Sequence, residues 1–240
     1  MSRTTASDKV LSGLRVRDAA RFAWAKYITP DQLQRVRRGM SERLVRKGSF
    51  VCRVGGPPDN WYGVLDGLVK MSIATPDGSE VIFLVVSTGG WFGEGTLLKK
   101  EQRRYDIVAL RDTRIALMPR SNFIWLVENS ASFDRFLLDQ LNARLGQVLG
   151  SVAYGRSQST IARVAHSLAT LFHPDLYPNA SRTIQLSQEE VGHLAGISRQ
   201  RANEALRALE REGLIVASYG NVTVLDITSL QNYSSAQRRR

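Results

Sequence analysis

Cysteine and histidine are scarce in this sequence. Cys52 is the only cysteine, and the first of the three histidines is His166. One thiol excludes an intramolecular disulfide, an all-cysteine metal site and an iron–sulfur cluster, which usually needs four thiolates. A haem or metal site built from histidines is not expected before His166, because that part of the chain has none.

Long apolar runs are also absent. The first nine residues lack the apolar core of a signal peptide, and no stretch approaches the roughly 20 apolar residues that span a membrane. We therefore predict a soluble, cytoplasmic protein with no membrane partner. Its 240 residues are enough for two compact domains, and 43% of them are hydrophobic. The formal charge of +11 favours a polyanionic partner such as nucleic acid.

Residues 186–206 predict two short helices around a glycine turn. Apolar residues recur at helical spacing on one face of each helix, and Gly196 lies where a tight reversal calls for positive φ. Ser187 and Glu190 form a capping-box pattern for the first helix, and Ser198 is placed to cap the second. This arrangement is typical of a helix-turn-helix, although a plain helical hairpin shares the pattern.

The second helix begins near Arg199 with polar and basic side chains. Arginine can pair with guanine edges, and glutamine or asparagine with adenine edges, in the major groove of double-stranded DNA. Residues 214–217 and 222–225 then predict a β-hairpin, or wing, which makes DNA binding a more specific interpretation than either motif alone. The candidate DNA-binding residues are Ser187, Gln188, Ser198, Arg199, Gln200, Arg201 and Asn203.

The first half has a different texture. Residues 44–117 contain short apolar runs separated by glycine, proline and aspartate, which predicts antiparallel strands closed into a jelly roll or barrel. Val69, Met71 and Ile73 alternate with more polar residues and should share a buried face, and residues 75–78 predict a turn.

A glycine-rich segment and a basic loop occupy residues 89–104 of this region. Successive backbone N–H groups and a nearby arginine can hold a phosphate, whereas a tight turn with a solvated basic loop explains the same residues. Both interpretations stay open. The candidate effector-binding residues are Gly93, Glu94, Gly95, Thr96, Arg103 and Arg104.

A long helix is predicted between Ser132 and Tyr154, where no proline occurs. Five residues at three–four spacing build a coiled-coil seam for a homodimer, although the same stripe could pack within one subunit. They are Leu138, Leu141, Leu145, Val148 and Val152. Four other apolar residues are expected to face the β-roll, namely Phe133, Phe136, Leu137 and Leu149. Residues 155–157 then end the helix in a hinge.

These parts, in this order, resemble the cyclic-AMP receptor protein/FNR (Crp/Fnr) family of bacterial transcription regulators. The resemblance rests on Phe92-Gly93-Glu94 and the arginine-bearing loop, the long helix, residues 163–168 and the winged helix-turn-helix. It covers about residues 20–226. In that family a β-roll senses an effector, a long helix pairs two subunits, and the winged domain reads a palindromic operator.

The resemblance implies an α+β fold and no enzymatic activity. The expected parts are N-terminal helices with an antiparallel β-roll sensor domain (1–131), a dimerisation helix (132–156) and a winged helix-turn-helix DNA-binding domain (157–240). A cupin-type β-barrel enzyme fused to a winged helix is the alternative class. Such enzymes collect several histidines around a metal, which this chain lacks before His166.

The resemblance also assigns roles near the C-terminus. Arg199 matches the family's guanine-reading arginine, whereas Gln200 replaces the usual glutamate and Glu204 the usual second arginine, so a different half-site is expected. Arg201 and residues 238–240 should contact phosphate or stay solvated. The loop 172–178, expected to be exposed, resembles in position the segment that contacts RNA polymerase, a contact that an activator requires. Whether the protein is an activator, a repressor or both stays open.

The effector is where chain and family pattern diverge. Glu94 and Arg103 match the phosphate cassette of cyclic-AMP-binding members, but Arg104 follows where those members carry a hydroxyl, and Val148 and Leu149 stand where they offer hydroxyls to adenine. Cyclic AMP is therefore disfavoured. Another cyclic nucleotide, a cyclic dinucleotide whose extra phosphate would meet Arg104, another small anion, and an effector-independent regulator remain open. Cys52 is either a redox switch or a buried structural thiol.

Overall fold

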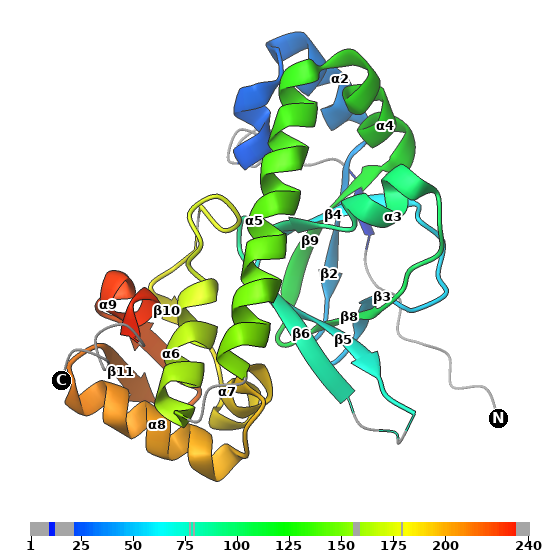
Figure 1. The fold of residues 1–240 in the computed structure, drawn as a ribbon. Helices are drawn as coiled ribbons and strands as arrows, with labels where there is room; N and C mark the ends of the chain where they lie inside the picture. The colour runs from blue at the N-terminus through cyan, green and yellow to red at the C-terminus, as the bar shows by residue number, and fades with distance from the viewer. Residues whose placement is uncertain are drawn as a thin grey trace. The chain divides into compact units, whose positions relative to one another are not determined.

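A computed structural model describes residues 10–12, 22–76, 78, 80–155, 159–178 and 180–233 (Figure 1). Contacts divide the chain into a first unit, Met1–Ile73 with Val86–Asp139, and a second unit, Ala74–Val85 with Gln140–Arg240. Helices and antiparallel strands occur together, which confirms the α+β prediction. Across the described ranges, no helix has the length and apolarity to cross a membrane.

Antiparallel strands form the predicted β-roll. One sheet has the order β1-β2-β9-β4-β7 and another β3-β8-β5-β6, so strands from distant parts of the sequence lie side by side. Residues 74–85, at the end of the β5–β6 hairpin, count with the second unit. The strands are β1 (Val10–Ser12), β2 (Ser41–Val45), β3 (Phe50–Cys52), β4 (Asn60–Asp66), β5 (Leu68–Ala74), β6 (Glu80–Ser87), β7 (Trp91–Phe92), β8 (Asp106–Ala109) and β9 (Thr113–Pro119).

The predicted alternation in β5 is correct only in part. Val69 and Met71 are buried as expected, but Ile73 is 44% exposed. The last two residues of the strand lie outside the covered part of the sheet, so their side chains meet solvent whichever face they occupy. The predicted turn is present, with Gly78 at φ 81° and its N–H donating to the Thr75 carbonyl at 2.9 Å. Asp77 lies outside the described residues.

An aromatic core fills the first unit. Trp24, Trp61, Trp91 and Phe133 are all buried, and the Trp61 and Trp91 ring centroids lie 4.3 Å apart. Around this core lie the short helix η1 (Ala23–Tyr27), α2 (Pro30–Gly39), α3 (Glu94–Lys99), α4 (Arg120–Asn129) and the beginning of α5 (Ala131–Gly155). The helix predicted between Ser132 and Tyr154 is confirmed by α5, while Arg156, the last residue of the expected dimerisation segment, lies outside the described residues.

One residue of α5 lies on a different face from the one predicted. Phe133, Phe136 and Leu137 are buried in the first unit, as expected, but Leu149 is 60% exposed. Leu149 follows Val148 directly and lies eleven residues beyond Leu138, which is three helical turns, so it widens the exposed stripe instead of the buried face.

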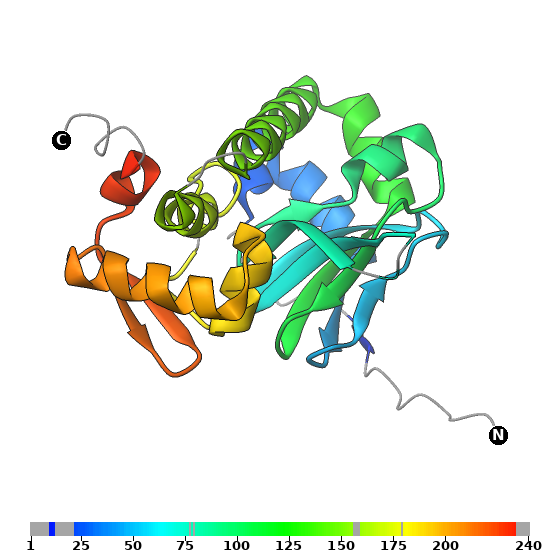
Figure 2. The ribbon, with the colours of Figure 1, turned by 60° about the horizontal axis from the view of Figure 1, so that its bottom comes forward.

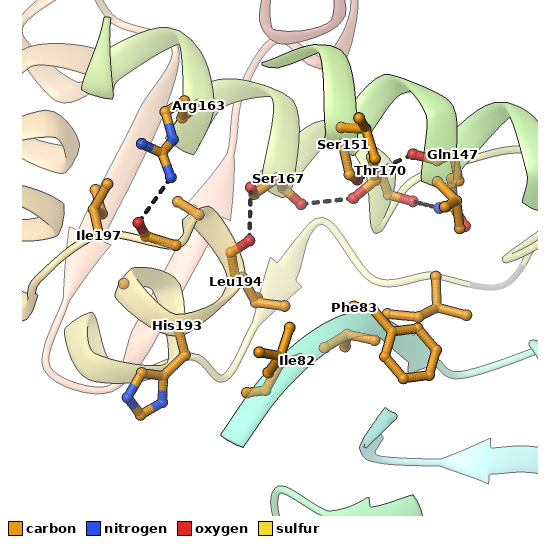
Figure 3. A pocket seen from close by; sticks show the side chains of 18 of the residues that line it. Ile82, Phe83, Gln147, Ser151, Arg163, Ser167, Thr170, His193, Leu194 and Ile197 are labelled. Carbon is orange, nitrogen blue, oxygen red and sulfur yellow. Dashed lines mark hydrogen bonds between the residues drawn. The ribbon is translucent and has the colours of Figure 1, made fainter. Parts of the chain in front are cut away.

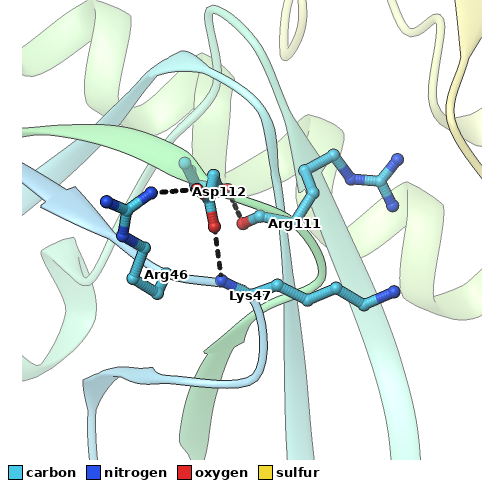
Figure 4. Close-up of polar contacts among 5 residues, drawn as sticks. Arg46, Lys47, Arg111 and Asp112 are labelled. Carbon is cyan, nitrogen blue, oxygen red and sulfur yellow. Dashed lines mark hydrogen bonds and ion pairs between the residues drawn. The ribbon is translucent and has the colours of Figure 1, made fainter.

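The Asp112 carboxylate connects two turns of the β-roll. Asp112 accepts hydrogen bonds from the Arg46 side chain and from the Lys47 N–H at 3.0 Å (Figure 4). These bonds hold the pKa of the Asp112 carboxyl below its usual value, with the Lys47 N–H contributing most. The turn after β2 is thereby tied to the turn between β8 and β9.

The second unit contains the predicted winged helix-turn-helix. It comprises α6 (Thr160–Thr170), α7 (Gln188–Ala195), α8 (Arg199–Arg211), the wing strands β11 (Ile215–Ser218) and β12 (Asn221–Val224), β10 (Thr183–Ile184) and α9 (Ile227–Gln231). Figure 2 shows α8 in orange beside the wing hairpin. Strand β10 pairs with β12 and makes the wing a three-stranded sheet, which, like α9, was not predicted.

The loop 172–178 is not the exposed segment that was predicted. Phe172, Leu176 and Tyr177 are buried, and the Tyr177 hydroxyl donates to the Val85 carbonyl at 2.9 Å. The amide of Gln140 donates to the Asp175 carbonyl at 2.6 Å. The prediction failed because it treated the loop's apolar residues as surface, whereas they pack within the second unit.

Candidate nucleic-acid interface and sensor site

Both helices of the helix-turn-helix begin with the predicted serine caps. Ser187 Oγ accepts from the Glu190 N–H at 3.2 Å, and the Glu190 carboxylate accepts from the Ser187 N–H at 2.7 Å. This reciprocal pair is the expected capping box. Ser198 Oγ accepts from the Arg201 N–H at 3.4 Å, at the start of α8. The caps define where the second helix begins and therefore which side chains its first turns present.

The turn between these helices depends on a glycine and an arginine. Gly196 has φ 61°, a left-handed conformation that favours glycine, as predicted. Its carbonyl accepts a hydrogen bond from Arg163 Nη2 of α6 at 2.7 Å. A third helix therefore holds the turn that leads into α8.

Helix α8 has one buried and one exposed face. Ala202, Ala205, Leu206 and Leu209 are buried, whereas three candidate DNA-reading residues at the N-terminal end are exposed. They are Arg199, Gln200 and Arg201. An exposed N-terminal end with polar and basic side chains is the part of such a helix that meets base edges.

Three candidate reading residues already have side-chain partners. The Gln188 amide donates to Asn203 Oδ1 at 3.1 Å, which joins the starts of α7 and α8. The Gln200 amide donates to Glu204 Oε1, also at 3.1 Å. Glu204 thus orients Gln200, a role that the sequence comparison with other members did not suggest.

Two further exposed residues were missed by the sequence analysis. Arg207 follows Gln200 by seven positions, or about two helical turns, and therefore lies on the same exposed face of α8. Tyr219 at the wing tip is fully exposed. Helical spacing could have identified Arg207, while the exposure of Tyr219 follows from its place between the paired strands β11 and β12.

The predicted phosphate cluster centres on a buried arginine. Arg103 is only 2% exposed; its Nη1 donates to Thr96 Oγ1 at 2.7 Å and to the Gly93 carbonyl at 3.2 Å. Its Nη2 donates to the Asn60 carbonyl at 2.6 Å, and its guanidinium lies 5.1 Å from the ring centre of Tyr62. The sequence has no hydroxyl residue directly after Arg103, but the structure places the Thr96 hydroxyl of α3 against the guanidinium.

Arg103 keeps unused binding capacity. Its Nε is buried without a hydrogen-bond partner, and within the described ranges no carboxylate lies close enough to pair with its charge. The partners that it does have are neutral oxygens. A buried cation surrounded only by neutral acceptors favours an anionic ligand.

The other candidate effector-binding residues do not contact the Arg103 guanidinium. Glu94 is buried and accepts from Trp61 Nε1 at 3.3 Å, beside the aromatic core. Gly95 is exposed, and a side chain there would meet open space. Arg104 is exposed and pairs with Glu101 at 2.8 Å. The structure thus groups Gly93 and Thr96 with the central arginine and leaves Gly95 and Arg104 outside that group.

Cys52 is half-buried in β3, and burial raises the pKa of its thiol to about 11. At neutral pH it is therefore protonated, which supports the structural interpretation over the redox switch. Across the described residues, no three His, Cys, Asp or Glu side chains form a cluster that could hold a metal ion.

The predicted seam of α5 is largely uncovered. Leu138, Leu145 and Val152 are each more than half exposed, Val148 is 37% exposed, and Leu141 is half-buried. A stripe of large apolar side chains along one helix face is a typical protein–protein contact surface.

The sequence matches two domain families in the expected order. Residues 42–130 match the cyclic nucleotide-binding domain, and residues 162–233 match the Crp-like helix-turn-helix domain. The transcriptional regulator SdrP of Thermus thermophilus is 30% identical over 191 residues, covering 77% of this chain and 88% of SdrP. The chain belongs to the Crp/Fnr family of transcription regulators. The Crp/Fnr assignment makes it a DNA-binding regulator and not an enzyme.

A second relative and a solved structure are also similar to this chain. The cAMP-activated global transcriptional regulator CRP of Pasteurella multocida is 27% identical, covering 73% of this chain and 86% of its own. FixK2 of Bradyrhizobium japonicum shares the fold, with a TM-score of 0.66 at 20% identity, covering 80% of this chain and 96% of that structure. The match of residues 42–130 to the cyclic nucleotide-binding domain identifies no specific effector.

Proposed function

We propose that this Crp/Fnr regulator works as a homodimer whose two α8 helices read inverted half-sites in adjacent major grooves. The observation that carries the proposal is the exposed N-terminal end of α8, where Arg199, Gln200 and Arg201 face solvent directly after a capped turn. Arg207, two turns further on, extends this surface. Arginine and glutamine supply the donors that distinguish guanine and adenine in the major groove.

The exposed stripe on α5 supports pairing of two subunits. Its leucines and valines repeat every three or four residues, so a second copy of α5 could cover them along its whole length. A symmetric dimer would present two reading helices about 34 Å apart, one turn of DNA. The operator would then be palindromic.

Sedimentation equilibrium tests the dimer. Leu145→Glu places a charge in the seam of both subunits and should weaken dimerisation at least about a hundredfold. Gly146→Glu is the control, because it adds the same charge on a neighbouring face where a side chain meets open space. Unchanged dimerisation of Leu145→Glu would show that the stripe is not the interface.

Selection of bound sequences from random DNA tests the reading helix. Arg199→Ala should reduce the preference for the selected operator over random DNA by about tenfold to a hundredfold, because one bidentate base contact is lost. Arg211→Ala is the control: it removes the same charge at the other end of α8 and should lower affinity for all sequences similarly. Equal preference in Arg199→Ala and wild type would remove Arg199 from the reading role.

We infer further that the Arg103 cluster takes the phosphate of a cyclic nucleotide or a related anion. The Arg103 guanidinium, which pairs with no carboxylate of the described residues, and the Thr96 hydroxyl would donate hydrogen bonds to the phosphate. The phosphate would replace the carbonyl oxygens that the guanidinium now contacts. A relative is named as cAMP-activated, which supports this class of effector. Calorimetry with cyclic AMP, cyclic GMP and cyclic di-GMP, on wild type and Arg103→Ala, tests it; no heat with any of them favours effector-independent regulation.

Contact with RNA polymerase, and hence activation in the cytoplasm, stays a prediction of the family resemblance. The loop 172–178 offers a smaller surface for it than expected, since Pro174, Asp175 and Pro178 are exposed while the apolar residues are buried. In vitro transcription with purified polymerase and Asp175→Ala tests this contact.

A further inference from the structure

The second unit contains a pocket that is separate from the Arg103 cluster. Its volume is about 460 Å³, within the range that holds small organic ligands, and every residue that lines it belongs to the second unit. Strand β6 and helices α5, α6 and α7 form its walls (Figure 3). Most of the lining is apolar, including Ile82, Phe83, Leu84, Val152, Leu194 and Ile197.

One cation lines this apolar pocket. Arg163 of α6 uses Nη2 to hold the Gly196 carbonyl, at 2.7 Å, while its Nε is buried without a hydrogen-bond partner (Figure 3). Within the described part of the chain no carboxylate pairs with it. A guanidinium with an unused, desolvated N–H beside an apolar wall is a strong donor for a carboxylate.

We propose that the pocket binds an apolar monocarboxylate of the fatty-acid type. The carboxylate would accept hydrogen bonds from Arg163, and the hydrocarbon would lie between β6 and α7 against Ile82, Phe83 and Leu194. Ser167 and Thr170 on the same wall are already engaged, with the Leu194 carbonyl and the Ser167 carbonyl respectively. Gln147 and Ser151 also line the pocket and donate to the Thr170 and Gln147 carbonyls, and the other polar lining residues, Glu80 and His193, are exposed. The partly buried Arg163 is therefore the polar group that remains for a ligand, which favours one charged group on an otherwise apolar body.

The site is linked to the helix-turn-helix through Arg163. A ligand carboxylate competes with the Gly196 carbonyl for the guanidinium, and Gly196 belongs to the turn that leads to Ser198 and α8. Binding would loosen that turn and weaken operator binding. This consequence rests on the proposed DNA-reading function, whereas ligand binding itself does not.

Calorimetry on the full chain tests the binding, with sodium decanoate below its micelle-forming concentration and decanol as the uncharged match. Wild type should bind decanoate at least about tenfold more tightly than decanol, and Arg163→Gln should lose that difference. Arg182→Gln is the control, since Arg182 also donates to a backbone carbonyl, that of Leu225 at 2.9 Å, but does not line the pocket. Equal affinity of wild type for both ligands would overturn the role of Arg163.

Methyl NMR on wild type locates the ligand independently of any variant. Decanoate should shift the methyl signals of Ile82 and Ile197, which line the pocket, and leave those of Ile107 and Ile115, buried in the β-roll. Shifts confined to the β-roll, or none, would overturn the site. If these shifts occur but saturating decanoate leaves operator affinity unchanged, the pocket binds the ligand and the proposed coupling to α8 is wrong. If no operator can be found, the proposed DNA-reading function is wrong and the ligand site is unaffected.

Discussion

The reading helix and the sensor cluster use arginine in opposite ways. Arg199 is exposed at the start of a helix, where few neighbours restrict it, whereas Arg103 is almost completely buried with three neutral oxygen acceptors. The first is available to a large external partner. The second helps to hold the protein together and meets only a ligand small enough to enter. Loss of Arg199 should therefore affect function alone, while loss of Arg103 should affect stability as well.

The largest expected effect separates these two arginines. Arg103→Met removes the hydrogen bonds that the guanidinium donates to the Asn60 carbonyl and the Thr96 hydroxyl, while the Gly93 carbonyl keeps the Thr96 hydroxyl as a donor. The free energy of unfolding of the first unit should therefore fall by about 2 kcal/mol. Arg199→Met should change the free energy of unfolding of the second unit, followed by circular dichroism, by less than about 0.5 kcal/mol. Denaturation followed by tryptophan fluorescence is the measurement, because all four tryptophans lie in the first unit: Trp24, Trp61, Trp91 and Trp125. Equal losses of unfolding free energy in the two variants would contradict the different roles of Arg103 and Arg199.

A glycine pair sharpens the comparison within the sensor cluster. Gly93 has φ 96°, and a Cβ there would lie 2.5 Å from Arg103 Nη1, whereas a Cβ at Gly95 meets open space. Gly93→Ala should therefore lower the free energy of unfolding by about 2 kcal/mol and weaken any effector that uses Arg103. Gly95→Ala should be neutral or slightly stabilising. The same fluorescence measurement decides, and an equal response of both variants would contradict the role of Gly93.

On the reading side, the cap is expected to matter moderately. Ser187→Ala removes one half of the capping box and should destabilise α7 by about 1 kcal/mol. Ser218→Ala, an exposed serine in the wing, is the control and should have little effect. Hydrogen exchange of the Glu190 amide is the sensitive readout; if its protection is unchanged, the cap is not stabilising.

The smallest effect concerns pH. His166 stacks on Tyr154 at 4.1 Å between ring centres, and burial holds its pKa below the ordinary value of 6.5. The unfolded chain thus takes up this proton at a higher pH than the folded one. The free energy of unfolding of the second unit should fall as the pH drops through 6.5, by about 1 kcal/mol or less. Circular dichroism melts at several pH values should show this loss of stability in the wild type and not in His166→Phe, which keeps the ring stacking.

Much of the reading region was predictable because its determinants are local. The serine caps, the positive φ of Gly196 and the buried face of α8 each depend on residues a few positions apart. The sensor region was predictable in outline only. That Thr96 supplies the hydroxyl to Arg103, and that Arg104 turns away to Glu101, depends on how α3 and the following loop return to β4.

The same division holds for the misplaced residues. Tyr177 is buried because β6 and α5 supply its partners, Val85 and Gln147, from far along the chain. The residues around the loop 172–178 contain no pattern from which these distant partners could be predicted. Leu149 was assigned to the wrong face because periodicity shows which residues lie together on a helix but not which face the neighbouring elements cover.

By itself, the sequence determined the order of the parts, the family, the start of the reading helix and the apolar stripe on α5, since these follow from spacing along one chain segment. The tertiary structure alone decided that Arg103 is buried among neutral oxygens and that Arg163 holds the Gly196 turn beside an apolar pocket. Hydrogen bonds and burial between distant residues depend on the packed arrangement of the chain, and that arrangement is not written in any short pattern.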